Sequence, residues 1–143
     1  MRIANQTKKS RQAIQLDSLF SLFNRREKFM EKAFAYICAS EEAAPRLLKR
    51  YCRKIYELGY VPICPALMEG QYLTMDNPDD KRDFQNISRQ KLNRCRMLVV
   101  CGNEITSAMC SEIGQAEKRN LICTTLEGLA KIKEADGSAG LSR

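Results

Sequence analysis

The sequence predicts an α/β domain of three layers, in which an open, mostly parallel sheet of about four to five strands lies between helices. Short apolar runs that are typical of buried strands alternate with segments whose apolar residues recur at helical spacing. Each connecting segment is long enough for the crossover that parallel strands require. The chain of 143 residues suits one such domain and leaves little for a second.

The N-terminal segment, residues 1–31, differs from the rest of the chain in charge. Lys and Arg total 24 against 17 Asp and Glu, a net charge of +7. Residues 1–32 hold eight basic and three acidic residues and so carry +5 of it. Apolar residues over 12–31 follow near-helical spacing and predict an amphipathic helix. Such an arm can contact nucleic acid or an acidic partner, or it can simply be a solubilising extension.

Residues 32–135 are predicted to form the α/β domain. Its four clearest strands are residues 33–39, 60–64, 97–101 and 121–125. Pro62 cannot donate a hydrogen bond within a sheet, so the second strand is expected at an edge. Each strand run contains one cysteine, and these are expected to act as small buried hydrophobic residues: Cys38, Cys64, Cys101 and Cys123.

Helices are expected between and after these strands, at about residues 40–58, 81–94, 107–118 and 126–135. Ser40 offers an N-cap for the first of them, and Gly59 is a natural terminator. Thr106 or Ser107 caps the third, and Asn120 ends it. Residues 65–80 are expected to form a long loop, and residues 136–143 a disordered tail.

Composition excludes several kinds of chemistry. The chain has no histidine, which excludes histidine general bases, Ser-His-Asp triads and His-ligated zinc. It lacks a phosphate-binding glycine motif, and we expect no cofactor and no metal. Seven cysteines without a CxxC pair favour reduced thiols in the cytoplasm. The sequence shows no secretory signal and no apolar run long enough to span a membrane.

Residues 101–116 carry the strongest candidate site. A strand ends there, a polar turn follows, and a helix begins, so that free backbone N–H groups can bind an anion. Glu112 lies about one turn inside this helix and can face the same crevice. The alternative is that Glu112 is a solvated helix residue and that Gly114 only permits close packing.

Two halves of the chain together resemble the nucleoside 2-deoxyribosyltransferase-like superfamily, over about residues 33–126. The first half is GYVPICPAL, with Gly59, Pro62 and Pro65, and the second is SAMCSEIGQA, with Ser107, Met109 and Glu112. The resemblance is closest to small uncharacterised branches of that superfamily.

The resemblance implies a flavodoxin-like sheet with a nucleoside or nucleotide site at the carboxyl ends of its strands. Glu112 corresponds to the nucleophile that attacks the anomeric carbon of a deoxynucleoside. The residues expected to contact the ligand are those of the neighbouring loops and helix start: Ser40, Glu41, Gly102, Asn103, Thr106, Ser107 and Met109. Active relatives are oligomers, so a homodimer or a higher homo-oligomer is expected, with residues 14–29 as its contact.

Other acidic residues of that superfamily are replaced here. Arg96, Thr106 and Ser88 stand at or near their positions, and Ala39, Ser40 and Glu41 replace the usual first loop. Three hypotheses therefore stay open. The chain is an enzyme that cleaves or transfers at an N-glycosidic bond, a non-catalytic relative that binds a nucleotide-like ligand, or an interaction protein that acts through residues 1–32.

Overall fold

The computed structural model describes the backbone of residues 31–141 and the side chains of residues 31–135. The chain divides into two compact units, one ending at Lys32 and the other beginning at Ala33. The helix expected over residues 12–31 and the basic arm lie almost wholly outside the described residues.

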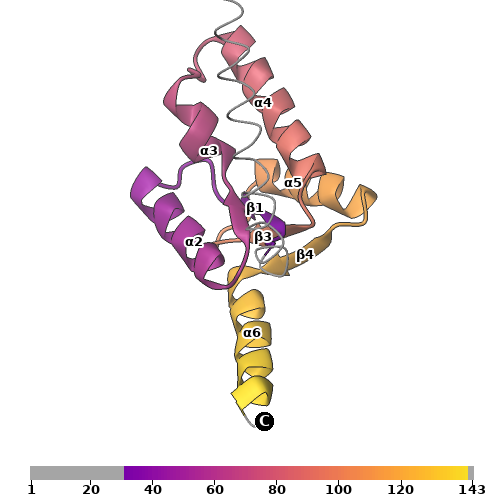
Figure 1. Ribbon diagram of the computed structural model, residues 1–143. Helices are drawn as coiled ribbons and strands as arrows, with labels where there is room; N and C mark the ends of the chain where they lie inside the picture. Colours follow the sequence, from indigo (N-terminus) through magenta and orange to yellow (C-terminus); the bar gives the residue numbers. More distant parts are fainter. Residues whose placement is uncertain (1–30, 142–143) are drawn as a thin grey trace, which may run out of the picture. The chain divides into compact units, whose positions relative to one another are not determined.

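The second unit is a parallel α/β sheet with helices on both faces, as the alternation of apolar runs predicts (Figure 1). Within residues 31–141 the sheet has four strands in the order β2-β1-β3-β4, and every neighbouring pair is parallel. The strands are β1 (Phe34–Cys38), β2 (Val61–Ile63), β3 (Met97–Val100) and β4 (Ile122–Thr125). β2 lies at an edge, which confirms the expectation from Pro62.

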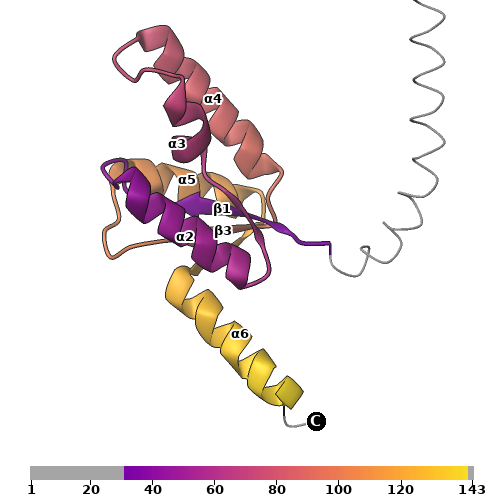
Figure 2. The ribbon, with the colours of Figure 1, turned by 60° about the vertical axis from the view of Figure 1, so that its left-hand side comes forward.

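The helices are α2 (Pro45–Glu57), α3 (Pro65–Met68), α4 (Pro78–Asn93), α5 (Ser107–Lys118) and α6 (Leu126–Leu141), with the 3-10 turn η2 (Glu69–Gln71) after α3. Figure 2 shows α4 and α5 on one face of the sheet and α2 and α6 on the other. Each face has its own core, because successive side chains of β1 point to opposite faces. Ala35 and Ile37 pack with α2 and α6, whereas Tyr36 and Cys38 pack with α4 and α5.

Two helices end as their sequences predict. Gly59 follows α2 with a φ of 100°, and Asn120 follows α5 with a φ of 60°. In both cases the next two N–H groups bond back to the last turn: Gly59 to the carbonyl of Tyr56 and Tyr60 to that of Ile55 after α2. This left-handed ending satisfies carbonyl groups that the helix cannot satisfy itself.

The start of α2 was predicted wrongly. α2 begins at Pro45 and not near Ser40, which lies in the preceding loop and accepts a hydrogen bond from the N–H of Glu42 at 3.3 Å. Proline favours the first helical position because it has no N–H to leave unpaired, and it keeps the residue before it extended. Ala44 accordingly has φ −65° and ψ 146°.

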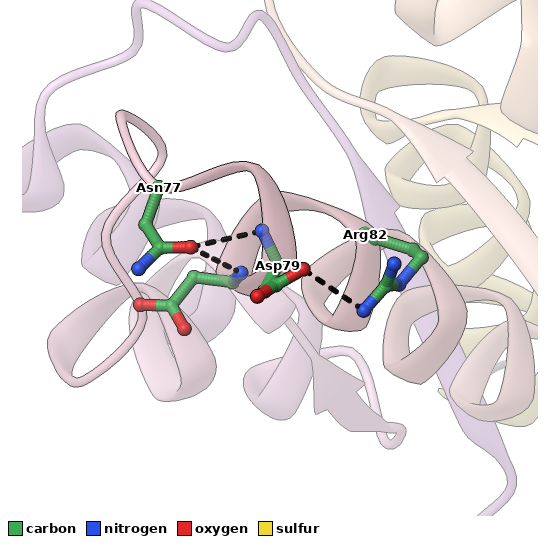
Figure 3. A network of polar contacts seen from close by, with 4 residues as sticks. Asn77, Asp79 and Arg82 are labelled. Carbon is green, nitrogen blue, oxygen red and sulfur yellow. Dashed lines mark hydrogen bonds and ion pairs between the residues drawn. The ribbon is translucent and has the colours of Figure 1, made fainter.

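α4 also begins earlier than expected, at Pro78. The side chain of Asn77 accepts hydrogen bonds from the N–H groups of Asp79 and Asp80, at 2.9 and 3.3 Å (Figure 3). Asp79 also pairs with Arg82, one turn along, at 3.1 Å. An asparagine cap, a proline and two acidic residues together favour a helix start. The predicted loop of residues 65–80 is therefore shorter, and it contains α3 and η2.

Two further expectations were wrong. α6 continues to Leu141, so it includes most of the predicted tail, since no proline or turn motif interrupts it. Cys123 is exposed because β4 is the other edge strand, whereas Cys38 and Cys101 are buried as expected. Within the described residues, no helix is both long and apolar enough to cross a bilayer.

Candidate functional site

Glu112 lies on α5 and faces the central strand of the sheet. The hydroxyl of Tyr36 donates a hydrogen bond to its Oε2, and the thiol of Cys38 donates to its Oε1 at 3.7 Å. Both donors are buried, with Tyr36 2% and Cys38 0% exposed. They are two residues apart on β1 and therefore share the face that α5 covers. The carboxyl group of Glu112 is thus held at both oxygen atoms by one strand.

The surroundings of Glu112 act on its protonation in opposite directions. Burial raises the pKa of the Glu112 carboxyl, the hydrogen bonds from Tyr36 and Cys38 lower it, and the charge of Glu41 raises it. Burial is the largest of these effects, so the pKa stays above its ordinary value. Burial and the Glu112 charge also raise the pKa of Tyr36 and of Cys38, so both remain protonated donors at neutral pH.

Glu41 brings a second carboxyl group to this end of the sheet. It lies in the loop after β1, and the hydroxyl of Thr106 donates a hydrogen bond to its Oε1. Thr106 is also the N-cap of α5, since its Oγ1 accepts the N–H of Met109 at 3.3 Å. The same threonine therefore starts α5 and joins it to the β1 loop. Glu41 acts on Glu112 through its charge, so two acidic groups share one electrostatic environment.

These residues lie where the strand order reverses. β1 is followed by β2 on one side and pairs with β3 on the other, so the crossovers leave β1 and β3 in opposite directions. In open parallel sheets, ligands bind in the crevice beyond the carboxyl ends of the strands at this point. Ser40, Glu41, Gly102, Asn103, Thr106 and Ser107 all follow β1 or β3 there.

Met109 does not belong with the predicted ligand contacts. Its side chain is 0% exposed and packs in the core between the sheet, α4 and α5. Its sulfur accepts the N–H of Thr106 at 3.4 Å. The matching residue of the motif therefore holds the start of α5 in place, and a buried side chain of this kind offers no surface to a ligand.

Arg96 lies away from Glu112. It is exposed and precedes β3, at the amino end of that strand, whereas Glu112 contacts β1 toward its carboxyl end. Ser88 on α4, in contrast, does approach the site, because its hydroxyl hydrogen-bonds Tyr36 and lowers the pKa of that phenol. The position where an acidic residue is replaced by serine is thus beside the carboxyl group and its donor.

Tyr51 is a residue of this region that the sequence did not indicate. It lies on α2, and its hydroxyl is 3.1 Å from the point where a side chain at Gly102 would begin. Gly102 itself has a φ of 90°, a conformation that other residues rarely adopt. The turn after β3 therefore needs glycine both for its backbone and for its contact with α2.

We expect Gly102→Ala to lower the free energy of unfolding by about 1–3 kcal/mol, because it combines left-handed strain with a close contact. Gly114→Ala is the matched control. Gly114 lies inside α5, and a Cβ there would meet nothing within 4 Å, so close packing does not require this glycine. Alanine favours a helix, so Gly114→Ala should be neutral or stabilising. Urea denaturation measures both, and equal losses would contradict the role given to Gly102.

Among the residues whose side chains are described, no group of three or more Cys, Asp or Glu is arranged to hold a metal ion. The site is therefore built from carboxyl, phenol, thiol and hydroxyl groups together with backbone N–H groups.

Fold and site together define a doubly wound parallel α/β domain with a half-buried glutamate at the point where its strand order reverses. Comparison with protein-family models matches residues 33–126, from the start of the sheet to the first residue of α6. The chain belongs to that family, which is described as a domain of unknown function (DUF7768). A search of curated proteins found no match.

Proposed function

We propose that this protein processes a nucleoside or nucleotide at its N-glycosidic bond, with Glu112 as the nucleophile. The observation that carries the proposal is the setting of Glu112, which is partly buried, held by Tyr36 and Cys38, and close to a second carboxyl group at the reversal of strand order. Glutamates that are merely solvated on a helix lack all of these features.

In the proposed reaction, the carboxylate of Glu112 attacks the anomeric carbon as the bond to the base breaks. A covalent glycosyl ester forms, and an acceptor or a water molecule then attacks the same carbon and releases the glutamate. The hydrogen bonds from Tyr36 and Cys38 favour the ionised form that attacks. They also fix the direction of the carboxyl group, so little reorganisation is needed.

Glu41 is the best candidate for the acid that assists departure of the base. It lies in the loop after β1, it is joined to the start of α5 through Thr106, and its charge acts on Glu112. A carboxyl group that gives a proton to the leaving base lowers the barrier to bond cleavage. The remaining ligand contacts are assigned to Ser40, Gly102, Asn103 and Ser107, with the N–H groups at the start of α5 facing a sugar or a phosphate.

One observation favours a second function, the binding of a nucleotide-like ligand without turnover. Both oxygen atoms of Glu112 already accept a hydrogen bond, and burial raises the pKa of the carboxyl. A glutamate satisfied in this way can also be a structural member of a binding site. The two functions differ in whether a base is released, and the experiment below separates them.

The proposed protein is cytoplasmic and works as a homodimer or a higher homo-oligomer. Residues 14–29, which supply the apolar face of the expected helix, are the proposed contact. Contact with nucleic acid or an acidic partner is assigned to residues 1–32, whose charge of +5 suits it. These residues lie almost wholly outside the described part of the chain. Sedimentation of the full chain and of a form lacking residues 1–31 tests both proposals.

The function is tested with a panel of deoxynucleosides and nucleotides and detection of the released base. We expect release by the wild-type protein, and a loss on the order of 10³-fold or more in Glu112→Ala, because the attacking group is gone. Glu112→Gln, which keeps the shape of the side chain, should be equally inactive. The matched control is Glu117→Ala, an exposed acid on the same helix, which should keep full activity.

Binding without release would favour the second function. Release that persists in folded Glu112→Gln protein would contradict the proposed nucleophile. Circular dichroism of each variant establishes that the variant is folded before its activity is compared.

A further inference from the structure

Two free cysteines lie side by side between α2 and β2. Cys52 is on α2, and Cys64 directly follows β2, which packs against that helix. Both side chains pack on the same core cluster, and the two thiols hydrogen-bond each other. Both are partly exposed, whereas Cys38, Cys95 and Cys101 are buried. Among the described cysteines, this pair combines adjacent sulfur atoms with access from solvent.

The two thiols are electrostatically different. The hydrogen bond from Cys52 lowers the pKa of Cys64 to about 7, with help from the N–H groups of Leu67 and Ala66 and against burial and the Glu112 charge. The same interaction raises the pKa of Cys52. Cys64 is therefore about half thiolate at neutral pH, and Cys52 is a thiol. Cys101, which also faces Cys64, has its pKa raised to about 12 by burial and is a thiol as well.

We propose that Cys64 and Cys52 form a dithiol site that reduces hydroperoxides, with Cys64 as the attacking sulfur and Cys52 as the resolving sulfur. The Cys64 thiolate attacks one oxygen of the peroxide, the O–O bond breaks, and an alcohol or water leaves with the proton it takes up. Cys64 is then a sulfenic acid. The Cys52 thiol attacks this sulfur, water leaves, and a disulfide joins the two residues. Two thiols and one hydrogen peroxide thus become one disulfide and two waters.

The other thiols lack one or the other requirement. Cys110 and Cys123 are exposed, but their sulfur atoms lie in no such hydrogen-bonded pair among the described residues. Cys38 is buried and donates its proton to Glu112. Cys101 is the one alternative partner for Cys64, since it belongs to the same core cluster. Reaction at this site therefore predicts one particular cross-link among those that seven cysteines allow.

The test treats the reduced full-length chain with equimolar hydrogen peroxide, blocks the remaining thiols by alkylation, and maps the peptides by mass spectrometry. We expect a disulfide between Cys52 and Cys64, reversible with dithiothreitol, while Cys110 stays free and is alkylated. In Cys52→Ser the sulfenic acid should persist at Cys64 and be trapped by dimedone. In Cys64→Ser the rate of peroxide consumption should fall about tenfold or more. Cys110→Ser is the matched control and should react at the wild-type rate.

A Cys64–Cys101 disulfide, first oxidation at Cys110 or Cys123, or an unchanged rate in folded Cys64→Ser protein would each overturn the proposal. Peptide mapping of the wild-type chain decides the matter even if a variant does not fold. Alkylation of Cys64 by iodoacetamide should also rise with pH around 7, well below the range for Cys101.

Discussion

Replacing Lys91 by methionine is expected to destabilise the folded domain by about 3 kcal/mol. The Nζ of Lys91 on α4 is 2.6 Å from Oε1 and 2.7 Å from Oε2 of Glu69 in η2. The Glu69 side chain is 3% exposed, so removing the lysine leaves a buried carboxylate without its counter-ion. Losing one member of a buried pair costs about 3–5 kcal/mol, and the lower end applies because the Lys91 side chain is 34% exposed and admits water.

The control is Lys81→Met, an exposed lysine on the same helix, which should change the stability by about 0.5 kcal/mol or less. The double variant Glu69→Leu with Lys91→Met leaves no buried charge, so it should regain most of the loss. Urea denaturation gives all the values needed for a double-mutant cycle. Equal losses in Lys91→Met and Lys81→Met would show that the Glu69 carboxylate is hydrated after all.

The second large effect is a pH dependence that Glu112 imposes on stability. Burial raises the pKa of the Glu112 carboxyl in the folded chain above its ordinary value of 4.5. The folded state therefore binds this proton more tightly than the unfolded state does. Its contribution to stability is fully present below pH 4.5 and is lost as the pH rises through the folded-state pKa.

Glu112→Gln cannot ionise, so it escapes this loss. The variant should gain stability relative to the wild type as the pH rises from about 4 to about 8, measured by urea denaturation at each pH. Glu117→Gln, on the exposed face of α5, should follow the wild type throughout. A difference between Glu112→Gln and wild type that shrinks as the pH rises would mean that the donors Tyr36 and Cys38 outweigh burial.

The sequence predicted the sheet well because the signal for it is local. A run such as MLVVC carries no charge and has only one way to be buried, so β3 was found within one residue. Pro62 marked an edge strand by a property of its own backbone. The end of α2 at Gly59 and the start of α5 at Thr106 also depend on single residues and their immediate neighbours.

The misses in the fold come from signals that compete locally. Ser40 is a good cap, but Pro45 determines where α2 begins, because the residue before a proline resists helical geometry. Asn77 and Pro78 were interpreted as loop residues although they also form the start of a helix. In both places the proline was the deciding residue, and its position relative to the cap was the overlooked information.

The site was predicted only in part, because its contacts join distant parts of the chain. Glu112 was singled out by its motif, yet Tyr36 and Cys38 lie more than seventy residues away, and only the packing of α5 on β1 brings them to it. Glu69 and Lys91 are separated by 22 residues, and their pairing requires that η2 folds back on α4. No pattern of residue types along the chain encodes these meetings.

The central place of β1 also governs the order in which this protein can be assembled. β1 is synthesised first among the strands, yet it pairs on both sides with strands that come later. Its tyrosine and its thiol wait for a helix that leaves the ribosome only after β3, so the acidic centre is completed late in synthesis. Contacts of such long sequence separation slow the folding of a domain, and a nascent chain that stops before α5 has a nearly complete sheet but no carboxyl centre.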